Sequence, residues 1–373
     1  MRTPTLAFAI LLAAATVFAA GTEPANNQTD NRLTGANAVE RLPKANREKT
    51  RSGLPWKSGV SPGTSKGSVA IEKINGFGNW RGRPVDIAAV FIGKNSWQKS
   101  YERYLDNEVL GPQGAVVALQ QAGVLILLTV PLVTQHDAGN FGWVAGGAID
   151  SQHEAVANKL KSLIGDGPIY LRLGHEADEG YPWSYTGHHG SGPDPANPAE
   201  YRAAWSRIAA IYKKTLPGAK LVWNVLKNTR QKITDYYPGD EAVDIISVDV
   251  YDNGFGGFCN SATSPGWVKL GLGSFNPSTG VSKGVAGVLA FARLHHKKIG
   301  VDEWGATNKE LKPSNGANNS YFVQGMYDFF AANSADLEYE SYFNRAGGGT
   351  HQIWPKTDYN PLPSDSYLMK WKP

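Results

Sequence analysis

The sequence predicts an α/β protein in which eight parallel strands close into a (β/α)8 TIM barrel that forms a single domain. From about residue 67 onward, apolar runs of strand length alternate with amphipathic stretches, which is the pattern of successive βα units. These runs are almost continuously apolar, as expected for parallel strands that are buried on both faces. Closure of such a sheet into a barrel removes its edges.

Eight strands are predicted in chain order, at Val69–Ile74, Val85–Ile92, Val124–Leu132, Ile169–Leu173, Leu221–Val225, Ile245–Val250, Ile299–Asp302 and Leu337–Phe343. The connections between them include four predicted helices, at Ser96–Gln121, Ala199–Leu216, Gly284–His296 and Asn319–Ala332. The second helix follows Asn197-Pro198, a favourable start, and carries Tyr201, Trp205 and Tyr212 on one face.

The N-terminal region lacks this alternation. Residues 1–20 are predicted to be a secretory signal peptide, because Arg2 precedes the apolar stretch Leu6–Val17 and small residues follow it. Residues 21–66 are rich in Asn, Thr, Gly, Pro and charged residues, so we expect a disordered linker or pro-segment. The barrel domain would then span residues 67–373, in a protein that is secreted or periplasmic.

The composition argues against some classes of protein and favours one that binds sugars. The net charge of +4 is spread along the chain, without the basic cluster that nucleic-acid binding requires. No apolar run after the leader approaches the length of about 20 residues needed to cross a membrane. Cys259 is the only cysteine, so an intramolecular disulfide cannot form. The 11 Trp and 16 Tyr residues suit stacking on sugar rings. We expect a monomer that binds a polysaccharide or oligosaccharide and needs no cofactor.

Two of the predicted strands end in a carboxylate. Glu176 follows the fourth strand and Glu303 closes the seventh, and in a barrel both strand ends face the C-terminal mouth, where active sites of this fold lie. A pair of carboxylates supplies the acid and the nucleophile of a glycosidase, whereas a single Glu at a rim is more often an ion-pair partner. Arg172 precedes Glu176 on the same side of its strand and would keep a nearby carboxylate ionised.

Several segments follow one another in an order that resembles the glycoside hydrolases of clan A, and most closely family 26, which includes β-mannanases. These segments are Arg172-Leu173-Gly174-His175-Glu176, Tyr181-Pro182-Trp183, Val222-Trp223-Asn224, Tyr237-Pro238-Gly239-Asp240, Val250-Tyr251 and Glu303-Trp304-Gly305. The resemblance covers about residues 80–343 and implies a retaining hydrolase with Glu176 as acid/base and Glu303 as nucleophile.

The same resemblance implies roles for residues around the pair. His175 would contact the sugar or orient the acid, Tyr251 would donate a hydrogen bond to the nucleophile, and Trp183 and Trp304 would form apolar walls of the sugar subsites. We also assign Arg172 and Asn224 to substrate binding. His136, just past the third strand, is a predicted lining residue of the mouth, and Trp80 is a candidate sugar platform; a structural role is the alternative for each.

Two features leave the substrate and the reaction class open. Asp178 and Glu179 depart from the family pattern and could bind a cationic group or a cation, or lie in a solvated loop; beside Glu176 they would raise its pKa. Besides mannan, other β-linked cell-wall or extracellular polysaccharides therefore fit. A noncatalytic carbohydrate-binding barrel is one alternative, and a metal-dependent polysaccharide deacetylase or lyase is another, although His136, Asp137, His188 and His189 match no zinc-binding pattern.

Overall fold

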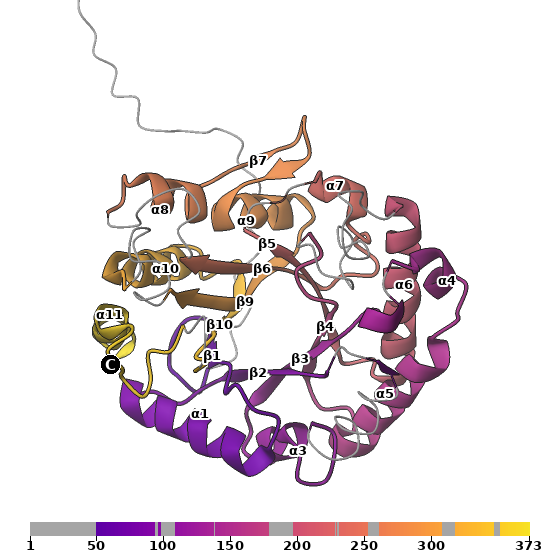
Figure 1. The fold of residues 1–373 in the computed structure, drawn as a ribbon, viewed down its shortest axis with the longest axis horizontal. Coiled ribbons are helices and arrows are strands. Elements are labelled where there is room, and N and C mark those ends of the chain that lie inside the picture. The colour runs from indigo at the N-terminus through magenta and orange to yellow at the C-terminus, as the bar shows by residue number, and fades with distance from the viewer. Residues whose placement is uncertain are drawn as a thin grey trace, which may run out of the picture. The chain divides into compact units, whose positions relative to one another are not determined.

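The chain folds into a closed barrel of eight parallel strands surrounded by helices (Figure 1), which confirms the predicted (β/α)8 class. The computed structural model describes residues 50–93, 96–97, 109–137, 139–178, 197–227, 229, 231–252, 261–307, 318–346 and 351–373. No helix in these ranges combines the length and the apolar character needed to cross a membrane.

The barrel strands, in the order in which they neighbour one another around the ring, are β1 (Lys57–Val60), β10 (Leu337–Tyr342), β9 (Lys298–Ala306), β6 (Ile245–Asp252), β5 (Lys220–Leu226), β4 (Ile169–Leu173), β3 (Leu125–Val130) and β2 (Ile87–Phe91). A separate antiparallel pair consists of β7 (Phe275–Asn276) and β8 (Val281–Ser282). Seven of the eight predicted strands overlap a barrel strand, and β4 has the predicted bounds. Glu176 therefore follows the fourth barrel strand, and Glu303 belongs to the seventh.

The described helices are α1 (Gly67–Arg81), α3 (Ala115–Gln121), α4 (Phe141–Ala145), α5 (Asp150–Ile164), α6 (Pro198–Thr215), α7 (Ile233–Tyr236), α8 (Pro265–Leu270), α9 (Gly284–Leu294), α10 (Ser320–Ala332) and α11 (Pro361–Trp371), with a short 3-10 turn, η2, at Gln135–Asp137. The start of α6 agrees with the prediction, since the Asn197 side chain accepts a hydrogen bond from the Ala199 amide at 3.0 Å and Pro198 opens the helix.

The barrel begins earlier than the sequence predicted. Strand β1 lies within the segment interpreted as a linker, whereas the predicted first strand, Val69–Ile74, lies inside helix α1. Strand β1 is short and has Ser58 and Gly59 at its centre, so it lacks the apolar run that marks the other strands. In α1, the buried residues Ala70, Ile74, Phe77 and Arg81 recur at helical spacing. Residues 1–49, which include the predicted signal peptide, lie outside the described residues.

Apolar side chains fill both sides of the barrel wall. The larger cluster lies between the strands and the helices. A smaller cluster lies inside the barrel and consists of Ile87, Ala89, Leu127, Tyr170, Val222, Ile245 and Tyr339. Polar residues replace these apolar ones toward the C-terminal ends of the strands, and that is where the candidate site lies.

Candidate active site

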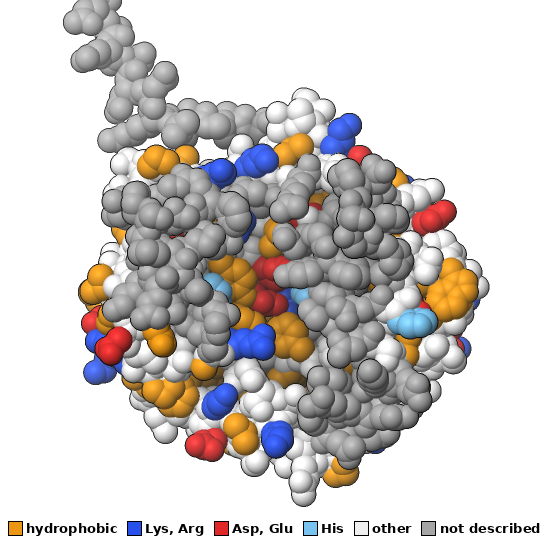
Figure 2. Space-filling view, in the orientation of Figure 1, with side chains coloured by type: hydrophobic (Ala, Val, Ile, Leu, Met, Phe, Trp, Pro, Cys, Tyr) orange, Lys and Arg blue, Asp and Glu red, His pale blue; other side chains and the backbone are white. Residues whose placement is uncertain are grey.

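A cavity of about 570 Å³ opens at the C-terminal ends of the barrel strands. Glu176 and Glu303 both line it, with Tyr251 between the strands that carry them. The other lining residues are Ser61, Gly63, Thr64, Ser65, Ala89, Val90, Phe91, Ile92, Gly93, Thr129, Pro131, His175, Phe343, Arg345 and His351. Figure 2 shows the hollow at the barrel centre, with acidic side chains deep inside it and hydrophobic and histidine side chains around them. The two predicted catalytic carboxylates thus share one cavity.

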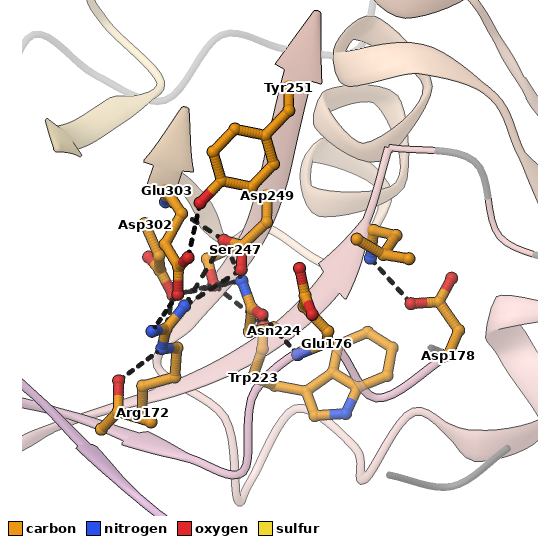
Figure 3. A network of polar contacts seen from close by, with 12 residues as sticks. Arg172, Glu176, Asp178, Trp223, Asn224, Ser247, Asp249, Tyr251, Asp302 and Glu303 are labelled. Atoms are coloured by element: carbon orange, nitrogen blue, oxygen red, sulfur yellow. Dashed lines mark hydrogen bonds and ion pairs between the residues drawn. The ribbon is translucent and has the colours of Figure 1, made fainter. Parts of the chain in front are cut away.

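An irregularity in β9 places two consecutive carboxylates inside the barrel. Val301 pairs with Val248 of β6, but Glu303 pairs with Asp249, the next residue of β6. Asp302 is therefore one extra residue in β9, which is a β-bulge. As a result, the side chains of Asp302 and Glu303 both approach Arg172 (Figure 3), where regular alternation would direct only one of them inward.

Arg172 is the centre of the polar network beneath the cavity. Its Nη2 donates to Glu303 Oε1 at 2.6 Å, and its Nη1 donates to Asp249 Oδ2 at 3.1 Å. Its Nε donates to Thr129 Oγ1 at 2.7 Å and lies 3.6 Å from Asp302 Oδ2. The side chain is fully buried, so the interactions with these carboxylates are poorly screened by solvent.

The charges in this network shift the pKa values of its members. Burial and the neighbouring Glu303 raise the pKa of Asp249 well above its usual range, although Arg172 opposes this shift. Burial also raises the pKa of Asp302. Burial by itself would lower the pKa of Arg172, but Glu303, Asp249 and Asp302 raise it on balance. Arg172 therefore stays charged, and its nearest carboxylate contact is with Glu303.

Tyr251 and His351 flank Glu303 on the other side. The Tyr251 hydroxyl donates to Glu303 Oε2 at 2.6 Å, the contact that the family resemblance implied. The His351 ring stacks on Tyr251 with centroids 4.2 Å apart. His351 Nδ1 lies 2.9 Å from the Ala306 carbonyl oxygen; because a carbonyl only accepts, Nδ1 carries the hydrogen. Burial lowers the pKa of His351 to about 4, so the ring is neutral near pH 7.

Sequence reasoning missed His351, which lies in the loop after β10. One signal for it was Gly305 in the segment Glu303-Trp304-Gly305. A Cβ atom at position 305 would lie 2.7 Å from the Cβ of His351, so glycine is needed there for His351 to approach the strand. The identity of the residue that approaches a glycine so closely was not visible in the sequence.

The backbone of Glu176 is held by Asn224. Glu176 has a φ of 48°, in the left-handed region that is unfavourable for a residue with a side chain. Its amide donates to Asn224 Oδ1 at 2.6 Å, and the amide of Ala177 donates to the Asn224 carbonyl at 3.0 Å. Asn224 Nδ2 in turn donates to Asp249 Oδ1 at 2.9 Å. Asp249 therefore links Asn224, which holds the backbone of Glu176, to Arg172, which binds the carboxylate of Glu303.

Two of the predicted substrate-binding residues do not line the cavity. Arg172 and Asn224 are both buried below the cavity, and their side chains form hydrogen bonds within the network just described. They can orient the residues that meet a substrate, but they do not reach the cavity surface. His175 and Tyr251 do line the cavity, whereas Trp183 lies outside the described residues.

Three further residues that the sequence analysis assigned to the mouth or to sugar contacts do not line the cavity. Trp304 is fully buried, donates to Glu340 Oε2 at 2.6 Å and stacks on Trp371, because the bulge at Asp302 leaves position 304 facing the helices. Trp80 lies on α1 and stacks on Tyr367, away from the cavity. The His136 side chain is 83% exposed beside Asp137 and does not line the cavity either.

Asp178 has a structural role that the sequence did not reveal. It is fully buried, and its Oδ1 accepts a hydrogen bond from the Leu226 amide at 2.7 Å. Figure 3 shows its side chain directed away from Arg172 and Glu303. Asp178 is thus part of the link between β4 and β5 and not of a solvated loop. Glu179 lies outside the described residues, as do His188 and His189. Among the described residues, no group of three His, Cys, Asp or Glu side chains is arranged to hold a metal ion.

A (β/α)8 barrel with a glutamate at the mouth of its fourth and its seventh strand has the architecture of the clan A glycoside hydrolases. Comparisons with known proteins agree with this class. Residues 138–270 match the model of glycosyl hydrolase family 26. Over 104 residues the chain is 36% identical to a mannan endo-1,4-beta-mannosidase of Thermothelomyces thermophilus, a match that spans 28% of this chain and 19% of that protein.

Solved structures of similar fold include the mannanase BCman of Bacillus subtilis, with a TM-score of 0.55, 15% identity and 88% coverage of each chain. The catalytic domain of a family 26 endo-beta-1,4-mannanase from Bacillus sp. JAMB-750 gives a TM-score of 0.56, with 14% identity and 86% coverage of each chain. At these identities the structures establish the common fold. The sequence matches, over residues 138–270 and over 104 residues, confirm the predicted resemblance to glycosyl hydrolase family 26.

The Arg172→Met variant should be strongly destabilised, because it leaves Asp249, Asp302 and Glu303 buried without their cation. We expect a loss of about 3–5 kcal/mol in the free energy of unfolding at pH 7, measured by urea denaturation. The matched control is Arg207→Met, which breaks an exposed ion pair with Asp150 and should leave the free energy of unfolding nearly unchanged. Equal losses in the two variants would contradict a central role for Arg172.

His351 should make the folded state sensitive to acid. Its pKa is about 4 in the folded protein, compared with an ordinary histidine pKa of 6.5, so the unfolded chain takes up the proton first as the pH falls. The stability that depends on neutral His351 is present above pH 6.5 and is lost toward pH 4. Between pH 7 and 4 the free energy of unfolding should fall by about 3 kcal/mol more in the wild type than in His351→Gln. Parallel pH profiles from chemical denaturation would show that His351 is not responsible.

Proposed function

We propose that this protein is a retaining glycoside hydrolase that cleaves a β-linked polysaccharide, with Glu303 as nucleophile and Glu176 as acid/base. One observation carries the proposal. Glu303 lies in the cavity with one carboxylate oxygen bound to Arg172 and the other to Tyr251, so its carboxyl group is held in a fixed orientation. Glu176 lines the same cavity from the neighbouring part of the barrel mouth, which is where the second carboxyl group of a glycosidase is needed.

In the first step of the proposed reaction, the Glu303 carboxylate attacks the anomeric carbon while Glu176 donates its proton to the leaving glycosidic oxygen. The bond between the sugar and that oxygen breaks, and a covalent glycosyl–Glu303 ester forms. In the second step, Glu176 takes a proton from water, and the resulting oxygen nucleophile displaces Glu303. Tyr251 stays protonated throughout, because burial raises its pKa well above the usual range.

We further propose a β-1,4-linked mannan as the substrate and cleavage within the chain. The proposal is supported by the relative of Thermothelomyces thermophilus, which is a mannan endo-1,4-beta-mannosidase, and by the two Bacillus mannanases that share the fold. A panel of mannan, xylan and β-glucans, with reducing-end release and product masses as the readout, tests this choice. Release from another glycan in preference to mannan would reassign the sugar and leave the mechanism unchanged. Binding without any release would favour a noncatalytic barrel.

We also propose that the enzyme acts outside the cytoplasm as a monomer. The proposal is supported by the sequence of residues 1–20, in which Arg2 precedes an apolar stretch with small residues at its end. Native mass spectrometry of the exported protein tests both points, since it should show a single copy of a chain that begins near Ala20. An unprocessed chain would argue against export by this route.

Glu303→Ala and Glu176→Ala should each lower kcat by about two to four orders of magnitude, because each removes one partner of the double displacement. On an aryl glycoside whose leaving group needs no proton, azide should partly restore both variants. It should give the inverted azide product with Glu303→Ala and the retained product with Glu176→Ala, distinguished by the anomeric proton signals in NMR spectra.

His136→Ala serves as the control, since its exposed side chain lies outside the cavity and its loss should leave kcat unchanged. Normal turnover in either Glu variant would rule out its assigned role. An inverted product from the wild-type enzyme would rule out the retaining mechanism.

A further inference from the structure

Ser61 presents a buried hydroxyl group that has no hydrogen-bond partner among the described residues. It directly follows strand β1, and its amide donates to the Tyr342 carbonyl of β10 at 2.9 Å, so its backbone belongs to the barrel wall. The residue is 1% exposed, and its Oγ makes no hydrogen bond. Burying a hydroxyl without a partner costs free energy, so such a group calls for an explanation.

The position of Ser61 distinguishes it from other hydroxyls of this kind. The Oγ atoms of Ser282 and Ser341 and the Oγ1 of Thr307 are also buried without a partner, but none of these residues lines the cavity. Ser61 does line it. Ser58, three residues earlier on β1, has its hydroxyl bound to Glu340. Within the described part of the chain, Ser61 is thus the buried unpaired hydroxyl that a molecule in the cavity could satisfy.

The ring order of the strands shows which part of a substrate Ser61 would meet. Strand β1 is separated from β4, the strand that leads to Glu176, by β2 and β3, so the two lie nearly opposite each other around the barrel. In the proposed reaction Glu176 protonates the leaving oxygen, and the leaving group therefore lies on the β4 side. The sugar that becomes bonded to Glu303 extends toward the wall that carries Ser61.

We propose that Ser61 Oγ forms a hydrogen bond with an unsubstituted hydroxyl group of the sugar on the glycone side of the cleaved bond, and so contributes to sugar selection. Gly63 and Gly93 line the same cavity, and their lack of side chains leaves room for a sugar ring near Ser61. A hydroxyl is neutral and both donates and accepts, so it recognises a sugar hydroxyl without requiring a charge on the substrate. This inference rests on the proposed glycosidase function.

The test compares Ser61→Ala with a matched control, Ser341→Ala. Ser341 lies on the adjacent strand β10 and is equally buried and unpaired, but it does not line the cavity. The substrate is the 4-nitrophenyl glycoside of the disaccharide that the polysaccharide panel identifies. Ser61→Ala should lower kcat/KM about fivefold to tenfold, which corresponds to about 1–1.4 kcal/mol. Ser341→Ala should leave kcat/KM unchanged.

Stability and substrate analogues give two further readouts. The midpoint of thermal unfolding should not fall in Ser61→Ala, because an unsatisfied buried hydroxyl is removed. In a series of glycosides that each lack one hydroxyl of the glycone sugar, one member should lose about fivefold to tenfold in kcat/KM with the wild type and show no further loss with Ser61→Ala.

The possible outcomes separate this inference from the proposed function. If the wild type cleaves the glycoside and Ser61→Ala matches Ser341→Ala in kcat/KM, the role of Ser61 is overturned while the glycosidase function stands. Equal losses in the wild type and Ser61→Ala across the whole analogue series would overturn it as well. If the wild type cleaves no glycan of the panel, the proposed function fails, and the role of Ser61 fails with it.

Discussion

The site depends on one buried cation inside the barrel. Removing Arg172 from water is costly, and the cost is offset only if its donors are paired with well-placed acceptors. Those acceptors are Thr129, Asp249 and Glu303, with Asp302 close by, and they come from strands β3, β6 and β9. The guanidinium therefore joins strands that lie on several sides of the barrel. A shift in the register of any of these strands would leave a charge unpaired, so the network that holds Glu303 also specifies how the upper half of the barrel is assembled.

The same network reaches the second carboxyl group by a different route. Asp249 accepts hydrogen bonds from both Arg172 and Asn224, and Asn224 holds the amide of Glu176 in an unfavourable backbone conformation. Glu303 is thus held through its carboxylate and also through its amide, which donates to Asp249 Oδ1 at 3.1 Å, and the amide of Glu176 is held by Asn224. A nucleophile benefits from a fixed charge, while an acid/base residue must exchange protons with the leaving oxygen and with water.

The sequence predicted the positions of residues well where they depend on a regular apolar strand. It predicted them less well where they depend on a strand irregularity or on a loop. Apolar runs located seven of the eight strands, but β1, with Ser58 and Gly59 at its centre, has no such run. The placement of Trp304 failed because the family resemblance put it beside Glu303 in the cavity, whereas consecutive strand residues face opposite sides. The bulge at Asp302 was not predicted either, because a bulge of one residue has no reliable sequence signal. Asp249 was missed because nothing near it in the sequence distinguishes an inward-facing carboxylate within a strand.

The polar residues beneath the cavity, which form its floor, and the residues that line its wall are subject to different constraints. Each polar residue of the floor shares its partners with others, so that Arg172, Asp249 and Asn224 cannot change independently. The wall includes residues that follow the strand ends, such as Ser61 and Phe343, and the side chains of these two residues make no hydrogen bond to Arg172, Asp249 or Asn224. Substitutions in the wall can therefore change which sugar is accepted while the charges that support Glu303 stay in place. This separation is a physical reason why proteins with one barrel chemistry can differ in substrate.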